Sequence, residues 1–336
     1  MRNSNFELLR LVAMFFIVFY HLLLFFITDI DTSPIYSALW MPLHVAVPIF
    51  VLISGYFHIT PSLRGVVKLT IPLIVYYLPL TIWELTHGIG RIEDLLFFSK
   101  SPYWFIRIYL CLFLLAPLLN AYLTSNRRKF YLLAVLGFVS IYMGTLHEPS
   151  LQDGKNLPLF MFLYVLGDYM KENKSIYERL CLYRLILIWL MYNTALVWGY
   201  TIYHNTFIGH ILWTLNFSYC SPILIINAAL LFVIFAKINL KSPFINWLSS
   251  STLSIYVIHH QHYILYSIIG VAVLWGYRIL SSPLTILLYI SIVTLLIMVS
   301  CVLIDKVITP PLLRLSTRLS DKAEERLKMY FPHRVQ

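Results

Sequence analysis

Charged side chains are scarce in this chain of 336 residues, and their scarcity excludes an ordinary soluble domain. Asp, Glu, Lys and Arg together make up 12% of the residues, whereas about a quarter is usual in soluble proteins. Hydrophobic residues make up 60% of the chain and aromatic residues 16%. We therefore expect an all-α protein that crosses a lipid bilayer several times.

Acidic residues are fewer than basic ones, 15 against 25, which leaves a formal net charge of +10. A basic excess can indicate a nucleic-acid partner, but here the Lys and Arg residues form no stripe outside the loops between apolar segments. We expect no nucleic acid among the partners. The excess is better explained as the loop charge of a membrane protein.

Patterns for disulfides and metal ions are also missing. The four cysteines lie inside or beside apolar runs and show neither C-x-x-C nor C-x-x-H spacing. This arrangement predicts no disulfide and no metal site. We expect Cys111, Cys181, Cys220 and Cys301 to be packing residues.

No small-residue cleavage site follows the first apolar segment, which is also longer than the core of a signal peptide. We expect this segment to remain as a membrane helix. Windows of about twenty residues predict about ten transmembrane helices in all. After the first, they lie near residues 36–57, 66–86, 103–121, 130–147, 157–170, 180–200, 218–236, 251–272 and 282–304.

The distribution of positive charge predicts the orientation of these helices. If the N-terminus is cytoplasmic, the cytoplasmic segments hold most of the 25 Lys and Arg residues, as the positive-inside rule requires. We therefore expect both termini in the cytoplasm. Residues 1–310 form the predicted transmembrane domain, and the tail 311–336 places leucines at helical spacing below basic residues. This tail is predicted to be an amphipathic helix on the membrane surface.

Arg10 and His21 lie on the first apolar segment and are about three helical turns apart. Their side chains should point the same way, separated by roughly 16 Å along the helix axis. An ionisable residue inside a membrane costs several kcal/mol unless it faces a protein interior or a wet cavity. His21 is therefore a functional candidate, with a structural histidine bonded to a neighbouring helix as the alternative.

Other histidines are placed inside the predicted spans. His44 should reach a depth similar to that of His21. His259, His260 and His262 form a cluster in which the first and last share a helix face. Without a carboxylate or a third ligand this spacing is a weak metal signal. We expect cavity-lining or hydrogen-bonding roles for this cluster and no bound metal.

Five sequence blocks follow one another along nearly the whole chain: ELLRLVAMFFIVFYH, VPIFVLISGYF, SPYWFIRIYLCLFLLAPLLN, FLYVLGDYM and STLSIYVIHHQHYIL. The first contains an Arg followed, after ten residues, by a His. In this order the blocks resemble those of the acyltransferase 3 family, integral membrane enzymes that O-acylate surface polysaccharides and related glycans. The chain is similar to the short, stand-alone members, because it lacks their longer relatives' Ser-Val-Glu-Glu block and hydrolase-like domain.

The resemblance implies a multi-pass protein of the bacterial cytoplasmic (inner) membrane that uses acyl-CoA, most simply acetyl-CoA, as the donor substrate. It implies no permanently bound cofactor. His21 would be the catalytic base and Arg10 its motif partner. Where the family has an Arg-rich stretch for the CoA phosphates, this chain offers Arg64 and Lys68 at altered spacing. The acceptor would be a sugar hydroxyl of a glycan or polysaccharide, and a homo-oligomer is left open.

The chemistry is consistent with these residues, because imidazole is the usual base near neutral pH and basic side chains bind phosphates. Two points stay open. His21 could deprotonate the acceptor or carry the acyl group itself. A polysaccharide transporter or flippase could use the same polar residues to line a pathway, although we find no internal repeat. A non-catalytic partner in glycan assembly would leave the aligned Arg10 and His21 unexplained.

Overall fold

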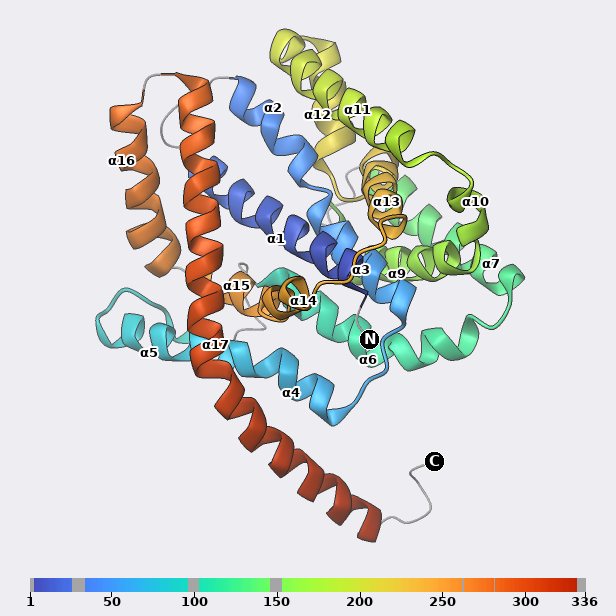
Figure 1. Cartoon of the computed structure of the whole chain (residues 1–336), viewed down its shortest axis with the longest axis vertical. Coiled ribbons are helices and arrows are strands. Elements are labelled where there is room, and N and C mark those ends of the chain that lie inside the picture. The colour runs from blue at the N-terminus through green and yellow to red at the C-terminus, as the bar shows by residue number, and fades with distance from the viewer. Residues whose placement is uncertain are drawn as a thin grey trace.

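A computed structural model of the chain consists of helices joined by short connections (Figure 1). Every regular element among the residues that it describes is helical. For 315–330 it describes the backbone alone. The described residues are 3–25, 34–95, 103–145, 153–261, 263–280 and 282–330.

Six helical segments are long and apolar enough to cross a membrane. They are α1 (Ser4–Phe25), α2 with α3 (Pro34–Leu43 and Ala46–Phe57), α4 to α5 (Leu63–Thr86), α6 (Trp104–Tyr122), α11 (Leu182–Tyr203) and the first part of α17 (Pro283–Tyr330). Two further pairs of helices are long and apolar enough to cross a membrane when each pair is taken as one span, but each pair is bent at its break. The first pair, α12 (Phe207–Phe217) and α13 (Pro222–Ala236), is bent by 54°. The second, Pro243–His259 with Ile264–Ile279, comprises α14 (Pro243–Ser249), α15 (Thr252–His259), a π-helical segment (Ile264–Gly270) and α16 (Val271–Ile279), and is bent by 93°.

The protein is thus a helical membrane protein with six to eight candidate spans among its described residues. The predicted spans at 130–147 and 157–170 coincide with α7 to α8 (within Asn126–Thr145) and α9 (Leu157–Glu172). Neither of these two segments is both long and apolar enough to count among the candidate spans. Helix α9 has 16 residues, or roughly 24 Å of helix, which is shorter than the hydrocarbon core of about 30 Å. The count of ten therefore stays a prediction, as do the orientation and the amphipathic tail.

Helix starts follow the sequence closely. The side chains of Ser62, Ser125, Asn156, Thr206 and Ser242 each accept a hydrogen bond from a backbone N–H three residues later. These caps satisfy N–H groups that have no partner within the helix. They place the starts of α4, α7, α9, α12 and α14.

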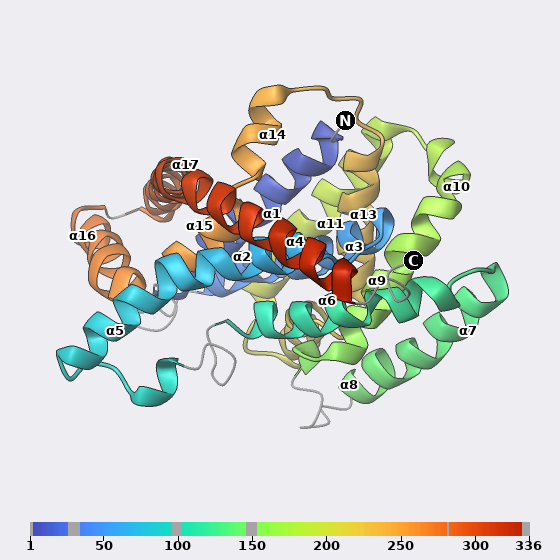
Figure 2. The same cartoon turned by 90° about the horizontal axis from the view of Figure 1, so that it is seen from below.

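Helix α1 lies in the middle of the bundle (Figure 1). It contacts α2, α3, α13, α14, α15 and α17. Figure 2 shows α16 and α7 at opposite edges, with α1 and α3 between them. Leu9 and Ala13 of α1 belong to one buried apolar cluster, whereas Val18 and Leu22 belong to another. Leu9 and Ala13 lie about half a turn round the helix from Val18 and Leu22, so α1 is packed into the core on two opposite flanks.

Two glycines let α3 and α9 cross with their backbones in contact. A Cβ atom on Gly55 would overlap the backbone of Tyr164, and one on Gly167 would overlap the carbonyl group of Leu52. The phenol of Tyr164 also donates to Asn120 at 2.7 Å and accepts from the backbone N–H of Ile59. Close packing of α3 and α9 thus explains the glycines in VPIFVLISGYF and FLYVLGDYM.

Ionised side chains join α7, α9 and the end of α3. The side chain of Lys129 is 1% exposed. Its ammonium lies 2.7 Å from Oδ2 of Asp168 and also pairs with Glu172. Nε2 of His58 lies 2.5 Å from the other carboxylate oxygen of Asp168. Because a buried charge is costly without partners, this group ties the three helices together.

Candidate active site

A cavity of about 1170 Å³ runs along α1. Its α1 lining residues recur every three or four positions, which places them on one face of the helix. They are Glu7, Arg10, Met14, Ile17, His21 and Leu24, with Tyr20 and Phe25 beside them. The shared face expected of Arg10 and His21 is thus the cavity face.

The cavity extends over nearly the whole length of α1. Glu7 and Phe25 both line it, and the helix between them is roughly 27 Å long. That length is close to the thickness of the hydrocarbon core, about 30 Å. The cavity therefore reaches from one end of a membrane span to the other.

Arg10 marks the end of the cavity near the start of α1. Its guanidinium lies 2.5 Å from Oε1 of Glu7, while Oε2 of Glu7 accepts a hydrogen bond of 2.5 Å from the hydroxyl of Ser249. Glu7 is buried, whereas the Arg10 side chain is 30% exposed. The carboxylate of Glu7 is therefore anchored to α14 and holds the guanidinium at the cavity wall.

The two predicted cations of α4 differ in position. Lys68 lines the cavity, as do Glu7 and Ser249. Arg64 is exposed one turn earlier on α4 and does not belong to the lining. The structure brings Arg10 and Lys68 to one cavity and leaves Arg64 outside it.

His21 bonds to a second histidine from a distant part of the chain. Its Nδ1 lies 3.0 Å from Nε2 of His259, and Nδ1 of His259 lies 2.6 Å from the carbonyl oxygen of Ile255. A carbonyl oxygen only accepts, so Nδ1 of a neutral His259 donates its proton to Ile255. Nε2 of His259 then accepts the proton on Nδ1 of His21, and Nε2 of His21 keeps a lone pair.

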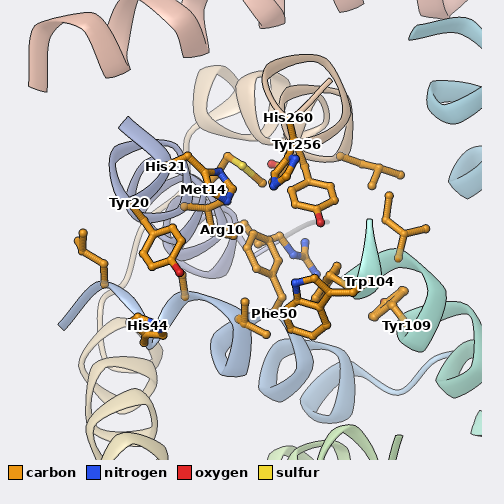
Figure 3. A pocket seen from close by; sticks show the side chains of 18 of the residues that line it. Arg10, Met14, Tyr20, His21, His44, Phe50, Trp104, Tyr109, Tyr256 and His260 are labelled. Atoms are coloured by element: carbon orange, nitrogen blue, oxygen red, sulfur yellow. The ribbon is translucent and has the colours of Figure 1, made fainter. Parts of the chain in front are cut away.

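His259 can hold this position because it is fully buried at the end of α15. The next residue, His260, lines the cavity, and its ring meets that of His21 edge to face at a centroid distance of 4.3 Å. Figure 3 shows His21 and His260 facing one open space, with Tyr20 and His44 at its side. His21 is therefore both bonded to a neighbouring helix and available to a ligand through one nitrogen.

The remaining predicted histidines have different places. His44 lines the cavity and bonds through Nδ1 to the carbonyl of Trp40 at 3.1 Å. Its ring meets that of Tyr20, the neighbour of His21. His262 lies outside the described residues, so the metal pattern that it would complete is untested. Among the described residues, no three His, Cys, Asp or Glu side chains are arranged to hold a metal ion.

Sequence reasoning did not identify Glu7, and it did not identify His21 as the partner of His259. Glu7 had a visible signal, because an acidic residue three positions before a cation on a helix can pair with it. The bond between His21 and His259 had none. It joins residues on α1 and α15, and it depends on how those helices pack against each other.

The fold and the cavity define a class of protein: a multi-pass membrane protein with imidazole and guanidinium groups along one intramembrane cavity. The family comparison is more specific. A family model described as "Acyltransferase domain" matches residues 3–305, and the chain belongs to this acyltransferase 3 family. It is therefore a membrane acyltransferase. No match was found among curated proteins or among solved structures.

Proposed function

We propose that the protein is an O-acyltransferase that moves an acyl group, most simply acetyl, from acyl-CoA to a sugar hydroxyl of a surface polysaccharide or glycan precursor. One arrangement carries the proposal: the bonds of His21 and His259 leave a lone pair on Nε2 of His21, and His21 lines the same cavity as Arg10 on the same face of α1. Membership of the acyltransferase 3 family supports the reaction class.

In the proposed reaction His21 is the general base. Its Nε2 takes the hydroxyl proton of the sugar while the hydroxyl oxygen attacks the thioester carbonyl. The new C–O bond forms as the C–S bond breaks, and the sulfur leaves with the electron pair. The imidazolium then returns the proton to the thiolate, which gives the CoA thiol and the O-acyl sugar.

The donor would lie with its phosphates at the Arg10 end of the cavity. Arg10 and Lys68 supply positive charge there, and a guanidinium can bind a phosphate through two parallel hydrogen bonds. Arg64, exposed on α4, could meet only the outermost part of the donor. Arg10 and His21 are separated by roughly 16 Å along the helix. That separation suits a donor whose phosphates and thioester stand at opposite ends of an extended arm.

In its full form the proposal includes about ten spans and cytoplasmic termini. It places the donor end in the cytoplasm of a bacterium and His21 in the outer half of the inner membrane. The acyl group would then cross the bilayer along the cavity while CoA remains inside. The cavity's length along α1 supports this step.

The test uses purified protein in liposomes, acetyl-CoA and oligosaccharides released from the surface glycan of cells that lack the gene. We expect CoA release together with acetyl transfer, detected by mass spectrometry of the oligosaccharide. Both should be lost in His21→Asn. Glycans from cells with and without the gene should differ by the same acyl mass. Unchanged glycans and no CoA release would contradict the proposal.

A transporter or flippase is the second candidate. Two observations favour it: the cavity reaches along a whole span, and two helix pairs are bent by 54° and 93°. Interrupted helices around a polar pathway are typical of transporters. A transporter, however, has no use for thioester chemistry, so CoA release separates the two functions.

A further inference from the structure

Aromatic rings connect one rim of the cavity to His21. The centroids of Trp104 and Tyr219 are 5.6 Å apart, those of Tyr219 and His44 are 5.5 Å apart, and those of His44 and Tyr20 are 5.0 Å apart. The ring of Tyr20 meets that of His21 at 5.2 Å. All five side chains line the cavity. We name Trp104, Tyr219, His44 and Tyr20 the ring series.

The rim at the far end of the ring series is a tightly fixed loop. The backbone carbonyl of Asp153 accepts a hydrogen bond of 3.1 Å from the N–H of Tyr219. A Cβ atom on Gly154 would lie 2.7 Å from atoms of Leu159 and Tyr219, so this loop has no room for a larger residue. The ammonium of Lys155 lies 5.8 Å from the ring centroid of Trp104. The loop is thus held against the break between α12 and α13.

This rim lies away from the basic end of the cavity. Trp104 and the loop 153–155 stand at the starts of α6 and α9, while the later parts of α3, α6 and α9 meet around Ile59, Asn120 and Tyr164. Arg10 is in the second turn of α1, whereas Tyr20 and His21 are near its end. His21 and the Tyr20 end of the ring series therefore lie near the end of α1 that is away from Arg10.

We infer that the ring series is the acceptor subsite and binds a pyranose ring that enters from the rim formed by the loop 153–155. The inference rests on the proposed function and adds the location and chemistry of its second substrate. A pyranose has apolar C–H faces and polar hydroxyl edges. Rings that carry a phenol, an imidazole or an indole N–H match both features, because each pairs an apolar body with a polar handle.

The arrangement also explains how two substrates reach one base. A sugar on the ring series would approach His21 past Tyr20, while the donor would approach it from Arg10. Neither substrate would have to leave before the other binds. Loss of a ring should therefore weaken acceptor binding and leave donor binding intact.

The test compares Trp104→Leu, Trp104→Phe and the control Trp198→Leu in liposomes. Trp198 is an exposed tryptophan of α11 that does not line the cavity. The probe is the oligosaccharide mixture released from the surface glycan of cells that lack the gene. We expect the KM for this acceptor to rise about tenfold in Trp104→Leu and less in Trp104→Phe, which keeps a ring. The KM for acetyl-CoA should stay within about twofold of wild type in all three, and the slow CoA release without acceptor should stay so in the control Trp198→Leu.

A rise in both KM values, or an equal effect in Trp198→Leu, would overturn the acceptor subsite. Binding of the same oligosaccharides to the His21→Asn protein, measured by calorimetry, separates this failure from that of the proposed function. Binding that Trp104→Leu weakens would support the subsite even if no CoA were released. Absence of binding to His21→Asn, with CoA release intact in the wild type, would overturn the subsite and leave the acyltransferase.

Discussion

Nε2 of His259 accepts a hydrogen bond from Nδ1 of His21 across 3.0 Å, and this bond decides which nitrogen of His21 can act as a base. Because His259 donates its own proton to Ile255, it presents a lone pair to His21 without carrying a charge. The arrangement orients an imidazole as the carboxylate of a Ser-His-Asp triad does, but with a neutral partner.

The first prediction concerns His21 itself. His21→Asn should lower kcat for acyl transfer by about 10²–10⁴-fold, because an amide cannot take the hydroxyl proton. Expression and detergent-solubilised size should match those of wild type. Wild-type activity should also fall as the pH is lowered, since a protonated imidazole has no lone pair to accept a proton. Near-normal transfer by His21→Asn would exclude the proposed base.

The second prediction tests His259 as a positioning residue. His259→Leu should lower kcat about a hundredfold, because His21 loses the acceptor that fixes its tautomer and orientation. His259→Gln, whose amide oxygen can accept the same hydrogen bond, should recover part of the activity. His259→Glu would place a carboxylate beside His21, and a carboxylate favours the imidazolium, so we expect the acid limb of the pH profile to move to higher pH. An unmoved profile would indicate a structural role alone.

The third prediction concerns stability. Lys129→Ala removes one partner from the buried group of Lys129, Asp168, Glu172 and His58. Breaking a buried ion pair in this way costs about 3–5 kcal/mol, so the midpoint of thermal unfolding in detergent should fall clearly. Lys174→Ala is the matched control, since the pair of Lys174 with Glu178 is exposed and its loss should change stability by less than about 1 kcal/mol. Equal midpoints in the two variants would contradict the structural role of Lys129.

The fourth prediction concerns orientation. A reporter fused after Arg128 should read cytoplasmic, and one inserted between residues 151 and 157 should read extracytoplasmic, if the Lys and Arg residues follow the positive-inside rule. The second position also marks the rim beside Lys155 and Trp104. Opposite signals would place the ring series in the cytoplasm and the Arg10 end outside, and the acyl-CoA would then have no access at Arg10.

Much of this arrangement could be predicted from the sequence because it belongs to single helices. The shared face of Arg10 and His21 follows from helical spacing alone, and the apolar segments predict most of the spans. The contacts between helices around the cavity could not be predicted. Arg64 and Lys68 are one turn apart on α4, yet only Lys68 reaches the cavity. The pairing of His21 with His259 and the ring series depend on packing between helices that are far apart in the sequence.

The last prediction separates the enzyme from a transporter through the acyl donor. Arg10→Ala should raise the KM for acetyl-CoA about tenfold or more, because a charged hydrogen bond to phosphate is worth about 1.5–3 kcal/mol. Arg10→Lys should recover only part of this affinity, since an ammonium cannot reproduce a two-pronged guanidinium contact. Glu7→Gln should weaken donor binding less than Arg10→Ala, because the guanidinium remains but loses its charged anchor. The KM for the acceptor should stay unchanged in all three variants. If purified wild-type protein neither binds acetyl-CoA nor releases CoA, while its loss stops export of an unmodified polymer, the cavity serves transport and Arg10 lines a pathway.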